Sequence, residues 1–200
     1  MQLHNIVETV TLLLGIGVAG FGFLQYRESQ RWKVSEFVAA EMRQLLDDSG
    51  NRAVLKMLDW SNGTVVVDDL HGNGRPLSFK FGRTLVISSL AVDRVVESSD
   101  PPPDGAAASP SNRYFDRDEE LVRGLFDEFF ADLERLNSYI DVENRLFEAA
   151  KLKPYLGYYL RIINRDDPLG GALRRFVETY GYTGTQNLVA EVSGMPWHVG

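Results

Sequence analysis

Residues with the types and spacing that chemistry requires occur in three places along the chain. The first is residues 15–20, GIGVAG, which match the G-x-G-x-x-G pattern of a dinucleotide-binding loop. That pattern binds a pyrophosphate when it follows a buried strand and opens a helix inside a βαβ unit. The residues before Gly15 do not form a strand pattern bounded by turns. We therefore do not interpret these glycines as a nucleotide site.

The second place is residues 151–175, which carry a net charge of +4 in a chain whose formal net charge is −7. Guanidinium groups bind phosphates, and aromatic rings stack on bases. The sequence predicts a ligand or anion surface here, built from Arg161, Arg165, Arg174, Arg175, Tyr158 and Tyr159. Its ligand would be a nucleotide, a phosphorylated signal or RNA. Two alternatives stay open: the arginines pair with acidic residues 116–135, or they face anionic lipid.

The third place is an acidic cluster that begins with Asp116, Asp118, Glu119 and Glu120 and continues to Glu134. Paired carboxylates can act as general acid and base or bind a divalent cation. Acidic residues at a helix start also complement the helix dipole, and the others would form a solvated face. We favour the solvated face and keep a membrane-bound hydrolase as an alternative.

The sequence offers little other chemistry. It has no cysteine, and none of its three histidines has a partner at metal-ligand spacing. It also contains neither a G-x-S-x-G nucleophile motif nor a Walker A motif. We therefore predict a non-catalytic protein with no cofactor and no metal.

The elements that position these residues start with an apolar segment. Residues 9–26 contain no charge, and residues 6–26 supply the roughly 20 apolar positions of a membrane helix. A secretory signal peptide would need basic residues before this segment, but they follow it. Because Lys and Arg concentrate on the cytoplasmic side, we predict a single-pass protein of the inner (plasma) membrane, with its N-terminus outside. The predicted interface anchors are Arg27, Arg31, Trp32 and Lys33.

Small residues recur along this segment at helical spacing. Thr11, Gly15, Ala19 and Gly22 fall on one face of a helix. Such a face lets two membrane helices approach closely, which predicts a homo-oligomer. The alternative is that glycine is simply common in membrane helices.

The chain is predicted to be mainly α, with a transmembrane helix that continues into a cytoplasmic helical domain with a small β-hairpin. Four segments are expected: residues 1–26 (tail and span), 27–97 (juxtamembrane helices and hairpin), 98–112 (a Pro/Ala/Ser-rich loop) and 113–200 (a helical bundle). In the second segment the first helix would end at Ser49-Gly50, a helix would follow over 52–60, a hairpin over 64–81, and a short helix in preference to a strand over 84–96.

The last segment has the strongest helix pattern. Asp116 and Glu119 have capping-box spacing, and an apolar stripe runs from Leu121 to Ile140. Further helices are expected from Pro154 to about residue 164, over 169–180, and over 183–192. We expect Thr183 or Thr185 to cap the last helix and the tail from Ser193 to be loose.

Several segments resemble an uncharacterised family of small bacterial membrane proteins, namely QYRESQRWKVSEFVAAEM, VLKMLDWSNG, LFDEFFADLERLNSYI, LKPYLGYYLRIINR and FVETYGYTG. The resemblance implies a single N-terminal span before a helical cytoplasmic domain, and it transfers no catalytic residue. The helix containing ERLNSYI and the one after it are also similar to bacterial domains of unknown function found near phage-defence genes.

Two functions follow from these patterns. The first is a non-catalytic membrane protein whose cytoplasmic domain binds a partner protein or signal and whose span self-associates. The alternative is a ligand-gated membrane effector, in phage defence, with its ligand docked on the arginines of residues 151–175.

Overall fold

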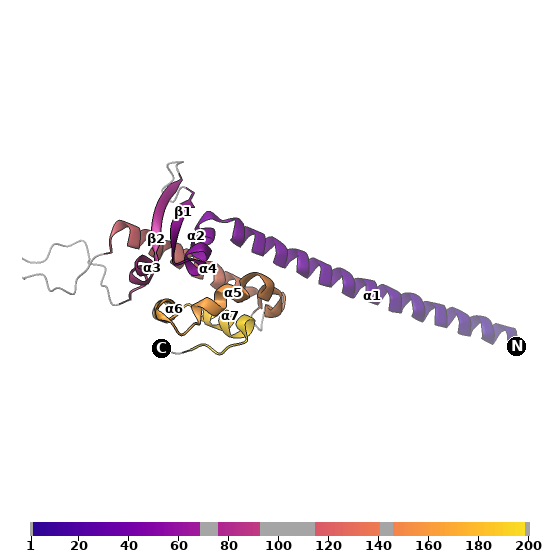
Figure 1. Cartoon of the computed structure of the whole chain (residues 1–200). Helices are drawn as coiled ribbons and strands as arrows, with labels where there is room; N and C mark the ends of the chain where they lie inside the picture. The colour runs from indigo at the N-terminus through magenta and orange to yellow at the C-terminus, as the bar shows by residue number, and fades with distance from the viewer. Residues whose placement is uncertain (1, 69–75, 93–114, 141–145, 199–200) are drawn as a thin grey trace, which may run out of the picture. The chain divides into compact units, whose positions relative to one another are not determined.

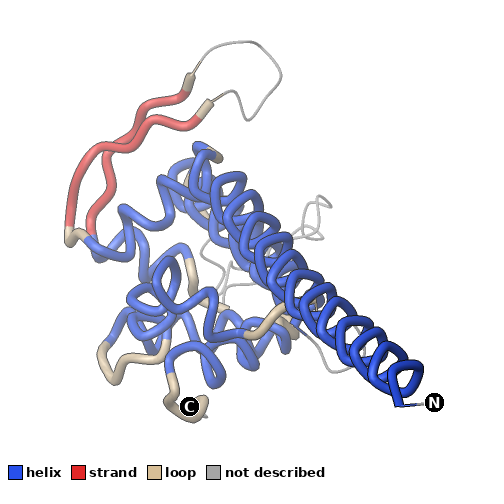
Figure 2. Tube along the Cα trace, turned by 90° about the vertical axis from the view of Figure 1, so that its right-hand side faces the viewer, coloured by secondary structure: helices blue, strands red, loops and turns tan. Residues whose placement is uncertain are grey.

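The computed structural model describes residues 2–68, 76–92, 115–140 and 146–198, with side chains described from Gly20 onward (Figure 1). These residues contain seven α-helices, one 3-10 helix and one two-stranded sheet, so the predicted mainly α class with a β-hairpin is confirmed (Figure 2). The chain divides into two compact units, residues 1–41 and 42–200. The predicted loop over 98–112 lies outside the described residues.

The first unit is almost entirely helical. Helix α1 (Gln2–Asp47) is continuous, as the absence of Pro and Gly after residue 22 predicts. The side chains of Thr11, Gly15 and Ala19 lie outside the described residues, whereas Gly22 is exposed. Within the part of the chain that the structure describes, no helix is long and apolar enough to cross a membrane.

The boundary between α1 and α2 (Ser49–Asp59) differs from the prediction. Asp48 is the N-cap of α2, and its Oδ1 accepts a hydrogen bond from the Asn51 amide at 2.8 Å. Ser49 and Gly50 therefore start the second helix and do not end the first. The prediction that Gly50 ends the first helix was wrong. The Asp48 carboxylate, two residues earlier, accepts from a free amide at the start of α2 and so begins a new helix there.

The hairpin is confirmed. Strands β1 (Asn62–Val67) and β2 (Leu77–Gly82) pair in antiparallel fashion, with Val65 opposite Phe79. Alternate residues of each strand are buried, which gives the sheet one face toward the core. Helix α3 (Arg83–Ser89) follows β2 directly, so the predicted helix after the hairpin is confirmed as far as Ser89.

Helix α4 (Arg117–Ile140) is the centre of the second unit and packs against α2, α3 and α7. Its predicted capping box is confirmed: Asp116 Oδ1 accepts from the Glu119 amide at 2.8 Å, and the Asp116 amide donates to Glu119 Oε2 at 3.1 Å. Its apolar face is buried from Val122 to Ile140. The residues on either side of positions 98–112 therefore share one core.

Three further helices complete this core: α5 (Lys153–Ile163), which follows a 3-10 turn at Ala149–Leu152, α6 (Pro168–Thr179) and α7 (Thr183–Ser193). All three lie close to the predicted ranges. Asp167 caps α6 by accepting from the Gly170 amide at 2.8 Å. Gly181, at φ +73°, ends α6 in the left-handed conformation that favours glycine.

Two predictions about the C-terminal region were wrong. Neither Thr183 nor Thr185 caps α7; the Glu134 carboxylate of α4 accepts from the Gly184 amide at 2.9 Å and the Thr185 amide at 2.6 Å. The tail is not loose either. Asn164 Nδ2 donates to the Pro196 carbonyl at 2.8 Å, and Trp197 Nε1 donates to Glu178 at 2.9 Å. Both contacts come from residues far away in the sequence, which local patterns do not reveal.

Candidate functional sites: a basic surface and an acidic groove

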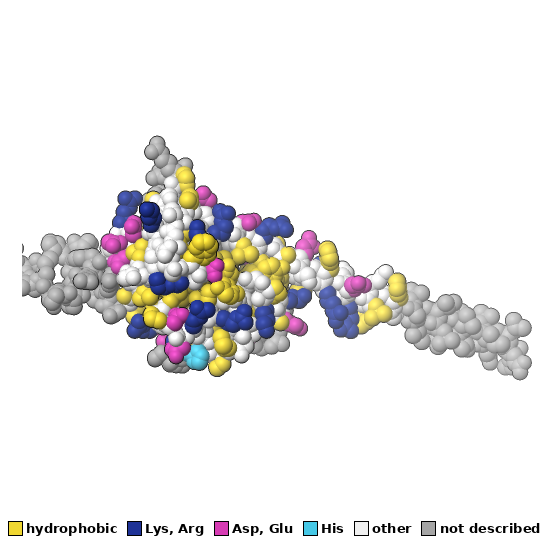
Figure 3. All heavy atoms as spheres, in the orientation of Figure 1, with side chains coloured by type: hydrophobic (Ala, Val, Ile, Leu, Met, Phe, Trp, Pro, Cys, Tyr) yellow, Lys and Arg dark blue, Asp and Glu magenta, His cyan; other side chains and the backbone are white. Residues whose placement is uncertain are grey.

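The structure brings only part of the predicted basic site together. Tyr158 is exposed and Tyr159 half-buried on α5, with ring centroids 5.2 Å apart. Arg165 directly after α5 is exposed, as are Arg161 on α5 and Arg175 on α6. Lys and Arg side chains lie along the face of the second unit on which α5 is seen (Figure 3). We call Tyr158, Tyr159, Arg161 and Arg165 the α5 surface.

Arg174 is not part of any surface, which corrects the sequence interpretation. Its side chain is only 7% exposed, and Nη1 donates to the Arg165 carbonyl at 2.6 Å. It belongs to the buried face of α6, with Gly170, Leu173 and Val177. The Arg174 guanidinium thereby supplies a hydrogen-bond donor to a carbonyl of the loop after α5.

The α5 surface is also tied to the fold. Tyr158 donates its hydroxyl hydrogen to Asp59 Oδ1 at 2.6 Å, which links α5 to α2. This hydrogen bond raises the pKa of Tyr158, and the nearby Arg165 guanidinium opposes that rise. Arg165 also pairs with Asp167 at 3.7 Å. Within the described residues, none of Arg161, Arg165 and Arg175 forms an ion pair with α4, as the internal-pairing alternative would require.

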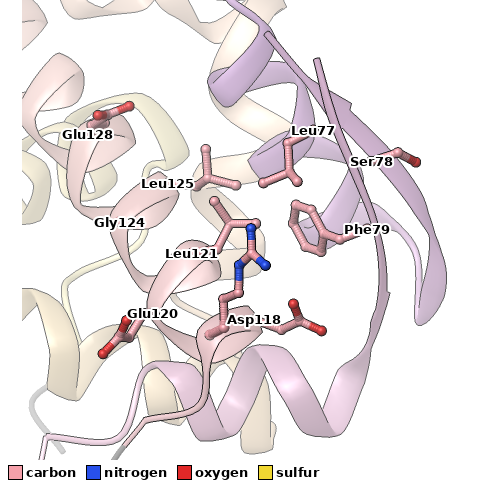
Figure 4. Close-up of a pocket in the computed structure, with 10 residues that line it drawn as sticks. Leu77, Ser78, Phe79, Asp118, Glu120, Leu121, Gly124, Leu125 and Glu128 are labelled. Carbon is pink, nitrogen blue, oxygen red and sulfur yellow. The ribbon is translucent and has the colours of Figure 1, made fainter. Parts of the chain in front are cut away.

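A pocket between β2 and α4 is a site that the sequence interpretation missed. It has a volume of about 450 Å³, and Leu77 and Phe79 of β2 face Leu121 and Leu125 of α4 across it (Figure 4). Gly124 also lines it, and a Cβ added there would meet no atom within 4 Å. The missing side chain leaves open space beside the leucines.

Charged residues surround these apolar walls. Asp118, Glu120 and Glu128 line the pocket together with Arg117, so its edge is net negative. Burial raises the pKa of Glu128, and the nearby carboxylates of Asp48, Asp127 and Asp132 raise it further. We call this pocket, with its apolar walls and acidic edge, the α4 groove.

The remaining carboxylates of α4 hold the fold together. Asp132 Oδ2 accepts from Nδ2 of the buried Asn51 side chain at 2.7 Å, Asp127 accepts from the Tyr182 hydroxyl, and Glu134 caps α7. The expected solvated face is therefore only partly solvated. Within the described residues, no group of three or more His, Asp or Glu side chains could hold a metal ion.

One feature of the sequence could have pointed to the groove. Gly124 lies in the middle of the strongest helix pattern, where a glycine is less stable than alanine by about 0.5–1 kcal/mol. A glycine there leaves open space beside the helix. The other wall of the groove comes from β2, whose position next to α4 depends on tertiary packing.

Comparisons of the chain with protein-family models, with curated proteins and with solved structures found no match.

Proposed function

We propose that this chain is a non-catalytic, single-pass protein of the plasma membrane whose helical domain lies in the cytoplasm and binds a partner protein or signal. The observation that carries the proposal is a band on α1 in which large apolar side chains lie exposed beside basic ones. The resemblance to small bacterial membrane proteins supports the same assignment and stays a prediction.

The band fits the interface of a membrane. Phe21, Phe23, Leu24, Tyr26 and Trp32 are 59–71% exposed. Burying one such side chain contributes about 1.5–3 kcal/mol, so a helix with five of them exposed gains from an apolar environment. The Arg27 guanidinium lies 5.9 Å from the centre of the Phe23 ring, and Arg31 and Lys33 follow. Aromatic rings next to basic residues suit the headgroup layer on the cytoplasmic side.

Vesicle flotation tests membrane insertion. The full chain, reconstituted with phosphatidylcholine and phosphatidylglycerol vesicles, should stay with them in high salt and in alkaline carbonate. Trp32→Ser should weaken the retention, whereas Trp60→Ser, a matched change of a 58% exposed Trp in the second unit, should leave it unchanged. Release of the unaltered chain by carbonate would overturn the proposed anchor.

Orientation can be tested by cysteine labelling, since the chain has no native cysteine. In intact cells a membrane-impermeant maleimide should label Gln2→Cys. It should label Glu191→Cys, an exposed position on α7, only after the membrane is opened. The reverse pattern would invert the proposed topology.

Self-association belongs to the same proposal. Gly22 and Gly20 are both exposed and without neighbours, but they lie on opposite faces of the helix, about 160° apart by the helical repeat. Gly22→Ile should therefore reduce oligomer formation in detergent, measured by analytical ultracentrifugation, and Gly20→Ile should not. Equal effects of the two changes would rule out the face formed with Thr11, Gly15 and Ala19.

The α5 surface favours a second candidate function, a membrane effector gated by a nucleotide or phosphorylated signal. Tyr158 and Tyr159 supply rings for stacking, and the nearby Arg165 supplies hydrogen-bond donors for a phosphate. A ligand at 100 times its dissociation constant would stabilise the full chain by about 2.7 kcal/mol. A thermal shift with nucleotides that disappears in Arg161→Glu/Arg165→Glu, but persists in Arg52→Glu, would favour this function. Without such a shift this function is ruled out for the nucleotides tested.

A further inference from the structure

The geometry of the α4 groove points to a particular class of partner. We propose that the groove binds an extended segment of a partner protein in which apolar side chains alternate with Lys or Arg. This rests on the proposed function, because it names the partner class of the domain that binds. Shape, charge and an open strand edge each contribute to the inference.

Shape favours apolar side chains. The facing walls are Leu77 and Phe79 on one side and Leu121 and Leu125 on the other (Figure 4). A volume of about 450 Å³ is in the range of pockets that accept a ligand's apolar groups. Gly124 keeps the space between them open, at a cost in helix stability of about 0.5–1 kcal/mol relative to alanine.

Charge favours a basic segment over an acidic one, because three carboxylates line the groove against the single guanidinium of Arg117. Within the described residues, Asp118, Glu120 and Glu128 form no hydrogen bond or ion pair through their side chains. Burial raises the pKa of Glu128, and repulsion from the nearby carboxylates of Asp48, Asp127 and Asp132 raises it further. A Lys or Arg of the partner would relieve that repulsion, whereas an acidic segment would increase it. The formal net charge of −7 attracts basic partners over a longer range.

The strand edge favours an extended segment. Strand β2 pairs with β1 on one side, and no other strand among the described residues pairs with it. An extended segment of the partner would add to the edge of β2 that faces away from β1. In an extended segment successive side chains alternate between the two faces. The apolar side chains on one face of the segment would enter the groove, and the Lys or Arg side chains on the other face would meet the carboxylates at its edge.

Peptide binding to the full chain in neutral detergent micelles tests this proposal. The probe is a fluorescein-labelled peptide, Lys-Leu-Lys-Ile-Lys-Val, compared with Glu-Leu-Glu-Ile-Glu-Val and Lys-Ser-Lys-Ser-Lys-Ser by anisotropy. Binding to micelles alone is subtracted. The first peptide should bind at least tenfold more tightly than either of the others, and its affinity should fall as salt is raised.

Two sets of variants locate the binding. Gly124→Leu should fill the groove and reduce the affinity for the basic apolar peptide at least tenfold. Gly171→Leu, at another helical glycine with open space around it, should bind like the unaltered chain. Glu120→Gln/Glu128→Gln should weaken binding and flatten its salt dependence, whereas Glu191→Gln on α7 should do neither. The charge variants alter exposed positions, so they test the proposal even if Gly124→Leu perturbs α4.

The outcomes separate the two levels of inference. Equal affinities for the basic and acidic apolar peptides, or unchanged binding by Gly124→Leu, would overturn the groove assignment. So would failure of the unaltered chain to bind the basic apolar peptide, and the flotation and labelling results would still stand. Loss of membrane retention with groove binding intact would overturn the proposed anchor alone.

Discussion

The basic segment, residues 151–175, and the acidic cluster of α4 are both clusters of like charges in the sequence, but the fold uses them in different ways. In the basic segment Arg174 is buried against the Arg165 carbonyl, and Tyr158 is bonded to Asp59. In the groove Glu120 and Glu128 have no such partner within the described residues. Arg174 and Tyr158 therefore hold helices together, whereas Glu120 and Glu128 are exposed at the edge of the groove.

The difference shows what decides the role of a charged side chain. An arginine can be held inside the fold where it donates to a loop carbonyl, as Arg174 does after α5. A carboxylate is drawn inward where a helix start leaves free amides, as at α7. Where neither lies within reach, the side chain stays at the surface, as at Glu120. The three predictions below test these contrasts, beginning with the largest expected effect.

Gly170→Ala tests how closely the loop at Arg165 packs against α6. A Cβ at Gly170 would overlap the Arg165 carbonyl oxygen and lie 2.9 Å from the carbonyl carbon, and these backbone atoms cannot swing away. The loop that Arg174 holds would have to move. We expect a loss of about 2–3 kcal/mol in the free energy of unfolding, as for overpacked sites, measured by urea denaturation of the full chain in detergent.

The next residue supplies the control. Gly171 has open space where its Cβ would be, so Gly171→Ala should keep or raise stability, by up to about 1 kcal/mol from helix propensity. If the two variants had equal stabilities, the close packing of the Arg165 loop on α6 would be disproved.

Local patterns predicted much of the fold. The hairpin was marked by β-branched residues and an alternating strand, and α4 by a capping box and a continuous apolar stripe. Both depend on residues only a few positions apart. The predicted end of α1 was wrong because two local patterns competed at neighbouring residues. Asp48 starts the next helix as its N-cap, and Gly50 therefore does not end the first.

The candidate sites were less predictable because they depend on contacts between distant residues. The burial of Arg174 depends on a carbonyl nine residues away, and the link between Tyr158 and Asp59 spans 99 residues. The α4 groove needs β2 beside α4, which no spacing along the chain indicates. Gly124 was the one sign of it in the sequence.

Glu134→Gln tests the structural half of the α4 carboxylates. The carboxylate accepts three hydrogen bonds from Gly184 and Thr185, and a glutamine side chain would present an NH₂ group to one of these donors. We expect a loss of about 1–2 kcal/mol, the usual value for removing a cap. Hydrogen exchange at the Gly184 and Thr185 amides should quicken. Glu191→Gln, on the exposed side of α7, should change neither the stability nor the exchange rates.

Glu128→Gln tests the α4 carboxylates that have no partner among the described residues. It should raise the free energy of unfolding, whereas Glu134→Gln lowers it. Because the folded state raises the pKa of Glu128 above its ordinary value, the charged carboxylate destabilises the fold at neutral pH. The glutamine variant should therefore be more stable at pH 7, by ~0.5 kcal/mol or less for a site this exposed. The gain should shrink as the pH falls through the raised pKa toward 4.5, where both states become protonated. Thermal unfolding between pH 4.5 and pH 7 measures it. A variant less stable than the unaltered chain at pH 7 would mean that Glu128 already has a cationic partner within the fold, and the groove would then lose its reason to attract a basic one.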